Sequence, residues 1–163
     1  MRFFGGWEFT QADANSRLPA AAGYRKRVPK GGEITGAPDG ASPTFLIAAM
    51  KDPMSGNLDR MQVVKGWIDS RNRTYEKVYN VAWGDAENRS LDASGELPPV
   101  GTTVDVANAT WSNTIGDPEL ITVWTDPDFD AEQRAFYYVR VLEIPTPRWV
   151  AYDAYRYGLD VPD

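Results

Sequence analysis

The chain has 163 residues and a net charge of −6, and its 42% apolar and 25% charged residues are ordinary for one folded domain with a real core. It contains no histidine and no cysteine, which excludes a Ser-His-Asp relay, a histidine-based iron site, an ordinary zinc site, a cysteine nucleophile and a disulfide framework. The acidic balance disfavours a nucleic-acid or anionic-membrane partner, and the short basic cluster Arg25, Lys26, Arg27 and Lys30 does not reverse it.

Residues 1–43 combine a short aromatic strand with a long loop. Residues 2–9 predict a strand that a glycine pair interrupts, and residues 11–17 predict a short helix. From residue 23 to residue 43 glycine and proline recur, as in a long ordered loop, and such loops are often functional. Because a domain normally starts with solvated residues, the aromatic start predicts a chain that continues upstream of Met1. We expect residues 1–43 to form the interface with that upstream part.

Residues 44–147 have the texture of successive strands and turns. Apolar runs separated by Gly, Pro, Asn and Asp predict strands at residues 44–50, 59–68, 75–83, 102–111, 120–125 and 135–144. Gly66 marks an expected bulge, and the last run is apolar on both faces, which is typical of a central strand. Residues 148–163 predict a short helix and a tail. The chain is therefore predicted to be mainly β, an antiparallel immunoglobulin-like β-sandwich with a long N-terminal loop region and a short C-terminal helix.

An acidic turn carries three carboxylates at alternate positions, Asp126, Asp128 and Asp130. This spacing suits an oxygen-seeking cation such as calcium. Ala131 and Tyr137 stand where an EF-hand loop has its glycine and its glutamate, so the EF-hand pattern fails. We favour a solvated Asp-Pro turn and keep a calcium site as the alternative.

Other residues have both a structural and a functional interpretation. Arg140 interrupts the last apolar run, either as a carboxylate-paired arginine at a sheet margin or as a ligand clamp. The pair Gly31 and Gly32 is neither a Walker loop nor a dinucleotide fingerprint and is typical of a turn with positive φ. Aromatic residues can pack in a core or stack on a sugar, and the candidates are Trp67, Trp83, Trp111, Trp124 and Trp149. A carboxylate enzyme would need two facing acids from the set Glu76, Asp85, Asp105, Glu119 and Glu143.

The sequence carries no targeting segment that we recognise. No window approaches the roughly 18 consecutive apolar residues of a membrane span. The first residues lack the apolar stretch of a signal peptide, so the localisation stays open.

Several long words of the sequence share their order and spacing with one bacterial family. They lie between residues 2 and 158 and include FFGGW at 3–7, KDP at 51–53, NLDR at 57–60, VKGW at 64–67, LPPVG at 97–101, TVWTDPDFD at 122–130 and AFYYVRVLEIPTPRW at 135–149. On these words the chain resembles the C-terminal region of the domain-of-unknown-function family DUF3604. Family members are large proteins, often exported, whose upstream region resembles the PHP-type metal-dependent hydrolases.

The resemblance implies a role for the chain and a place for the chemistry. A divalent metal would belong to the upstream PHP-like domain, the partner in cis, and this chain would hold no catalytic residue and no cofactor. The loop residues Tyr24, Val28, Pro29, Gly31 and Gly32 would line that interface or the rim of the active site. The chain is then expected to be a non-catalytic accessory β-sandwich, a fragment of a hydrolase of unknown substrate that can self-associate when alone. The alternative is an independent carbohydrate- or peptide-binding module.

Overall fold

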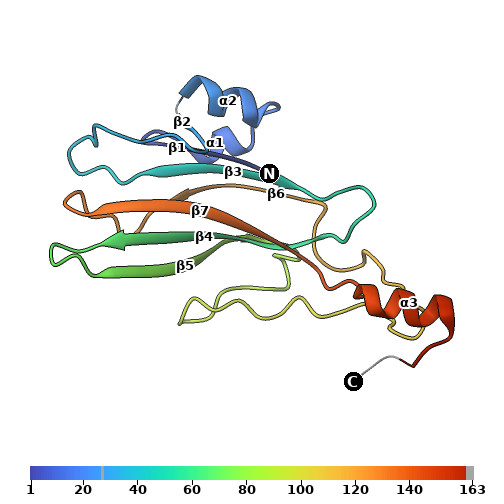
Figure 1. The fold of residues 1–163 in the computed structure, drawn as a ribbon. Helices are drawn as coiled ribbons and strands as arrows, with labels where there is room; N and C mark the ends of the chain where they lie inside the picture. Colours follow the sequence, from blue (N-terminus) through green and yellow to red (C-terminus); the bar gives the residue numbers. More distant parts are fainter. Residues whose placement is uncertain (27, 161–163) are drawn as a thin grey trace.

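The computed structural model describes residues 1–26 and 28–160, so Arg27 of the basic cluster and residues 161–163 lie outside the described part. Within that part, seven strands form two antiparallel sheets that pack face to face (Figure 1). Sheet A has the order β2 (Val28–Pro29), β1 (Arg2–Gly6), β3 (Thr44–Met50) and β6 (Glu119–Thr125). Sheet B has the order β5 (Thr74–Trp83), β4 (Leu58–Ile68) and β7 (Arg134–Glu143). The prediction of a mainly β, antiparallel two-sheet fold is confirmed, whereas an immunoglobulin-like topology stays a prediction.

The hydrophobic core lies between the two sheets. Phe45 and Ile47 of β3 and Met61 and Val63 of β4 belong to one cluster, and each is 2% exposed or less. Their odd numbers reflect the two-residue period of a strand, which sends alternate side chains to the interior. The inward-facing rows of sheet B are therefore the odd-numbered residues of β4 and the residues paired with them on β5 and β7.

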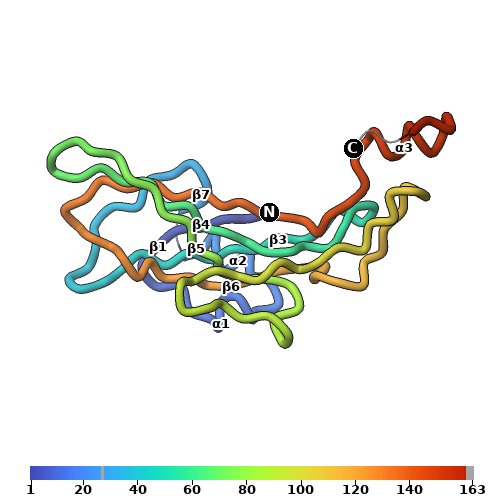
Figure 2. Tube along the Cα trace, turned by 90° about the horizontal axis from the view of Figure 1, so that it is seen from below, coloured from blue at the N-terminus to red at the C-terminus, as the bar shows by residue number. Residues whose placement is uncertain are grey.

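Two of the three helices cover sheet A, and the third lies beyond the sheets near the C-terminus. α1 (Gln11–Ala14) and α2 (Pro19–Lys26) lie over the outer face of sheet A (Figure 1). There Phe4, Phe9 and Leu46 form a second buried cluster with Ala14 of α1. α3 (Trp149–Tyr157) lies beyond the end of both sheets, as Figures 1 and 2 show. No helix among the residues that the structure describes has the length and apolar character needed to cross a membrane.

Three predictions for the N-terminal region are wrong. Gly5 and Gly6 are the last two residues of β1, so the strand ends at the glycine pair and does not resume at residues 7–9. A Cβ at Gly5 would lie 2.5 Å from Ile34 Cδ1, so glycine lets the chain pack closely there. The helix predicted at 11–17 ends at Ala14. The loop predicted from residue 23 begins as helix α2, which starts with proline at its first position and continues through three alanines. β1 also pairs with β3, so residues 2–6 form part of sheet A.

Three predictions for the rest of the chain also need correction. The strand predicted at 102–111 is wrong, because its residues form a tight turn in which the Asp105 carboxylate accepts hydrogen bonds from Asn108, and only a Asp105–Thr110 bridge remains. The register runs unbroken through Gly66, and the irregularity in the β4–β5 pairing lies between Met61 and Gln62. The apolar residues of 135–144 predicted a central strand, but β7 is an edge strand of sheet B and β4 is the central one.

Candidate functional site

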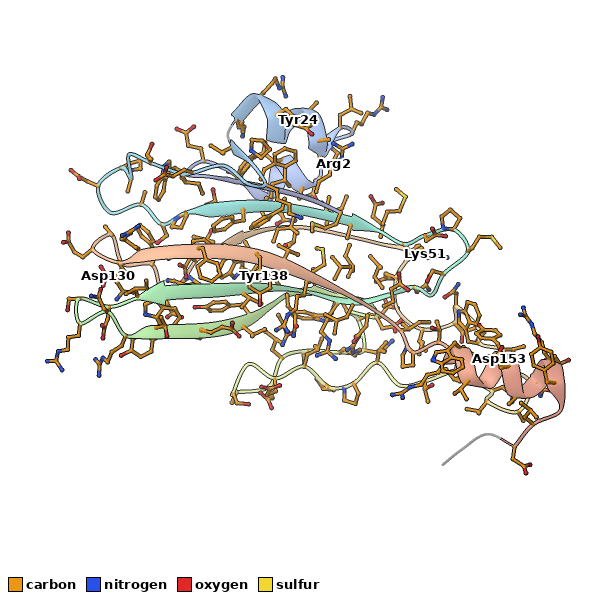
Figure 3. The ribbon with its side chains drawn as sticks, in the orientation of Figure 1. Arg2, Tyr24, Lys51, Asp130, Tyr138 and Asp153 are labelled. Atoms are coloured by element: carbon orange, nitrogen blue, oxygen red, sulfur yellow. The ribbon has the colours of Figure 1, made fainter. Side chains whose placement is uncertain are left out.

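Sheet B has an outer face over which no helix of the described residues lies (Figure 1). Over residues 62–68, 74–80 and 134–142 the even-numbered side chains point outward. Val64, in the middle of this face, is fully buried by its neighbours, whereas five large apolar side chains around it are 36% to 60% exposed: Ile68, Val78, Phe136, Tyr138 and Leu142. Figure 3 places Tyr138 on β7 and Tyr24 among the helices on the other side of the sandwich. We call this apolar surface of β5, β4 and β7 the open face. Contiguous apolar residues on an exposed surface are typical of an interaction site.

An aromatic pair on the edge strand β7 is the most exposed apolar part of the open face. The rings of Phe136 and Tyr138 are nearly parallel, at 11°, with their centroids 6.4 Å apart. Phe136 lies across Gly66 of the neighbouring strand so closely that a Cβ on that glycine would lie 2.4 Å from the ring. The phenyl ring can therefore occupy this position only because Gly66 has no side chain. A shallow depression of about 670 Å³ adjoins the pair, with Trp67, Tyr75, Glu76, Arg134 and Phe136 among its lining residues.

Polar and charged side chains border the aromatic pair. Gln62 of β4 donates a hydrogen bond to Asn80 of β5 at 2.9 Å, and the exposed Arg140 stands opposite Gln62 on β7. On the other side, Glu76 stands opposite Gly66. The predicted ligand clamp Arg140 thus lies at the border of the open face, in the row next to Tyr138. An apolar centre with a polar rim is the usual anatomy of a protein interface.

A second notable group lies in the interior, where the two sheets meet. Lys65 Nζ lies 2.6 Å from Asp126 Oδ2, and the two side chains are 3% and 0% exposed. The Tyr137 hydroxyl donates to the same oxygen at 2.7 Å, and the Asp128 N–H donates to Oδ1 at 2.9 Å. Burial, together with the hydrogen bond to Asp126, raises the pKa of the Tyr137 hydroxyl well above its usual value, so this group stays a proton donor.

The acidic turn is divided between the interior and the surface. The expectation of a solvated turn is wrong for Asp126, which is fully buried because Lys65 on the other sheet neutralises it. Asp128 accepts hydrogen bonds from Lys77 and Tyr79, and these bonds lower the pKa of its carboxyl group. Asp130 accepts the Glu132 N–H within the loop between β6 and β7. In the described part of the chain no three acidic side chains lie where they could share a metal ion, so the calcium alternative gains no support.

The predicted rim residues lie on the sheet A side. Tyr24 of α2 packs edge-on against Phe4, with ring centroids 4.9 Å apart, and remains 63% exposed. Val28 and Pro29 form the edge strand β2, which pairs with β1. Gly31 has a φ of 90°, as the sequence predicts for a turn that requires glycine. These residues and the open face therefore belong to different sheets.

The scattered acids and tryptophans do not assemble into one site. Asp85 accepts the Gly116 N–H, whereas Glu143, at the end of β7, accepts the Ser55 hydroxyl, so the two acids are bonded to different segments. Trp124 packs in the core against Phe45, Tyr79 and Tyr137, whereas Trp67 stacks on Tyr75. Trp149 is 76% exposed on α3, beyond the sheets. The aromatic surface is built from Phe136 and Tyr138 instead.

Sequence reasoning missed two features. One is the open face, because a run that is apolar on both sides, such as residues 135–144, predicts a strand that is covered on both faces. The other is Arg89, which is 9% exposed and donates to the Asp59 carboxylate at 2.8 Å and to the carbonyls of Gly84 and Pro98. An arginine in a polar loop gives no local signal of burial. Its partner Asp59 lies 30 residues earlier, on β4.

The fold and its surfaces define the class of protein: an antiparallel two-sheet β-sandwich with one helix-covered face and one open apolar face. The chain belongs to the DUF3604 family, described as "Protein of unknown function (DUF3604)", which matches residues 1–163, the whole chain. The predicted family membership is therefore confirmed. No curated protein and no solved structure matches the chain.

Proposed function

We propose that this chain is a non-catalytic accessory β-sandwich of a larger PHP-like metal-dependent hydrolase of unknown substrate. In this proposal the open face packs against the hydrolase domain in cis. The observation that carries it is the difference between the two outer faces, since α1 and α2 cover the apolar residues of sheet A, whereas Ile68, Val78, Phe136 and Tyr138 of sheet B remain 40% to 60% exposed. Exposed apolar area of this kind is stabilised when a second surface removes it from water.

The residue content supports a non-catalytic role. The chain has no histidine or cysteine to act as a general base, nucleophile or soft metal ligand. Its most buried ionisable groups, Lys65 and Asp126, neutralise each other inside the protein, where substrate has no access. The hydrolase chemistry in this proposal therefore belongs to the upstream domain. The role of Tyr24 and the residues after it as a rim of that domain's active site stays a prediction.

The first test is the association state of the chain alone. We expect the chain to self-associate in sedimentation velocity experiments, because the open face finds no other cover. The double variant Phe136→Ser/Tyr138→Ser should move the population toward monomer. Tyr24→Ser is the matched control, since Tyr24 is an equally exposed aromatic on the opposite side, and it should leave the association unchanged. A wild-type chain that is monomeric at every concentration, or a loss of association in Tyr24→Ser, would count against the open face as the docking surface.

The second test concerns the hydrolase itself. We expect a version of the protein extended upstream through the proposed hydrolase domain to hydrolyse some member of a panel of phosphate and sulfate esters with added manganese or zinc. The present chain should be inactive on the same panel. Activity of the present chain that survives a chelator would overturn the non-catalytic assignment and return the carboxylates to consideration.

A second candidate is a carbohydrate-binding module, and the near-parallel Phe136–Tyr138 pair is the observation that favours it. Aromatic faces stack on sugar rings, and the bordering Gln62, Asn80 and Arg140 could donate hydrogen bonds to hydroxyl groups. Affinity electrophoresis in gels that contain soluble polysaccharides separates the two candidates. Retardation of the wild-type chain, lost in Phe136→Ser/Tyr138→Ser and kept in Tyr24→Ser, would favour this second candidate.

A further inference from the structure

Lys65 and Asp126 connect the two sheets through a single pair of side chains. Lys65 lies on the inward-facing row of β4, the central strand of sheet B, and Asp126 directly follows β6 of sheet A. The amine nitrogen lies 2.6 Å from a carboxyl oxygen although 61 residues separate the two in sequence. Both side chains are almost fully removed from solvent, at 3% and 0% exposure. The fold therefore holds an amine and a carboxyl group in contact at a fixed place without competing water.

The surroundings of the pair are aromatic. Lys65 Nζ lies 5.5 Å from the ring centroid of Trp67 and 5.9 Å from that of Tyr137. A reaction between the two groups requires a neutral amine and a protonated carboxyl group, and the pair itself holds the proton that must move between them. Transfer of one proton from Nζ to the carboxyl group removes both charges. It leaves a neutral amine, which is a nucleophile, beside a carboxylic acid, which is an electrophile.

Hydrogen-bond donors hold both oxygens of that acid. Asp126 Oδ1 accepts the backbone N–H of Asp128 at 2.9 Å, and Oδ2 accepts the Tyr137 hydroxyl at 2.7 Å. A backbone N–H on a carboxyl oxygen can stabilise the negative charge that develops there when a nucleophile adds to the carbon. The Asp128 carbonyl oxygen lies 2.6 Å from Lys65 Nζ and fixes the position of the amine from another direction. The site thus contains a nucleophile, an electrophile, and hydrogen-bond donors to both oxygens of the carboxyl group.

We infer that Lys65 and Asp126 are the precursors of an intramolecular amide cross-link, formed within the folded chain. The neutral Nζ adds to Cγ of Asp126, and the charge that develops on Oδ1 is held by the Asp128 N–H. The proton that the new nitrogen substituent loses passes to the hydroxyl at Oδ2, which the Tyr137 hydroxyl holds in place by its hydrogen bond. The Cγ–Oδ2 bond breaks, one water leaves and an amide N–H remains. No electron is transferred and no co-reactant is needed, because amine plus carboxylic acid gives amide plus water.

Intact-mass spectrometry of the purified, fully denatured chain tests this inference. We expect the wild-type mass to be lower than the sequence mass by one water, and a proteolytic fragment that joins the peptides of Lys65 and Asp126. Lys65→Arg and Asp126→Ala should have their full sequence masses. Lys77→Arg, which changes the neighbouring exposed lysine paired with Asp128, is the control and should keep the water loss. Tyr137→Phe should leave a larger fraction of the chain uncross-linked.

The alternative outcomes are distinct. A wild-type chain with its full sequence mass overturns the inference and leaves Lys65 and Asp126 as an ion pair. A water loss that persists in Lys65→Arg also overturns it, because it would come from another aspartate, for example by cyclisation onto its own backbone. Neither outcome depends on whether the open face docks on a hydrolase domain. The test is therefore independent of the proposed function.

Discussion

Replacing Arg89 with methionine is expected to lower the free energy of unfolding by about 3–5 kcal/mol, as when one partner of a buried ion pair is removed. The guanidinium group donates to the Asp59 carboxylate at 2.8 Å and to the Pro98 carbonyl oxygen at 2.7 Å, and both charged side chains are 9% exposed or less. Methionine fills a similar volume but removes these donors from the loop carbonyls and from Asp59 Oδ1, so that Asp59 keeps only its ion pair with Arg60 at 2.9 Å. The loop that follows β5 would then lose its main attachment to β4.

Urea denaturation followed by tryptophan fluorescence measures this loss. Arg73→Met is the matched control, because Arg73 pairs with Asp69 in a turn and its side chain is 60% exposed, so that solvent screens the pair. We expect a far smaller change for the control. Equal losses in the two variants would show that burial does not set the contribution of Arg89. Arg89→Lys should fall between wild type and Arg89→Met, since lysine keeps the charge but not the planar fork of donors.

Replacing Phe45 with alanine is expected to cost about 3–5 kcal/mol of folding free energy, the usual range for removing a buried aromatic ring. Phe45 is 2% exposed and lies at the centre of the core. Its ring packs against Phe3, Trp124 and Tyr137, with centroid distances of 5.3, 5.7 and 4.6 Å. These rings come from three other strands in both sheets, so the cavity would form where the two sheets are held together.

Phe136→Ala on the open face is the control for this measurement. The same chemical change at a side chain that is 60% exposed should cost about 1 kcal/mol or less in the isolated chain. The two variants are compared by urea denaturation at a protein concentration where the chain is monomeric. A large loss for Phe136→Ala would mean that the ring packs against the rest of the monomer far more than its 60% exposure indicates, and would contradict the open face as a free docking surface.

Several structural features were readable from local sequence. The runs 44–50, 59–68, 75–83, 120–125 and 135–144 became strands with nearly the predicted ends, because turn residues and β-branched or aromatic runs act over a few positions. The terminal helix and the turn at Gly31 followed for the same reason. In contrast, residues 102–111 had strand composition, but the Asp105 carboxylate accepts hydrogen bonds from Asn108 and closes a turn that competes with the strand.

The open face was less predictable, because it is defined by the absence, among the described residues, of any helix packed on it. The alternation in β7 separates two sets of side chains, both apolar, and the sequence gives no sign that only the set of odd-numbered residues meets the core. Phe136 and Tyr138 were therefore read as buried. Only the sheet order, with β4 in the centre and β7 at the edge, together with α1 and α2 on the opposite sheet, leaves them exposed.

By itself the sequence determined which side chains the chain lacks, the β-rich fold and the family, since these depend on residue content, short-range patterning and long shared words. The tertiary structure alone decided which charges are buried and which apolar face is open. Asp126 reads as a turn residue until Lys65, 61 positions away on the other sheet, neutralises it, and Arg89 reads as a loop residue until Asp59 does the same. Burial of a charge depends on a partner that folding brings from a distance, and local sequence carries no record of that partner.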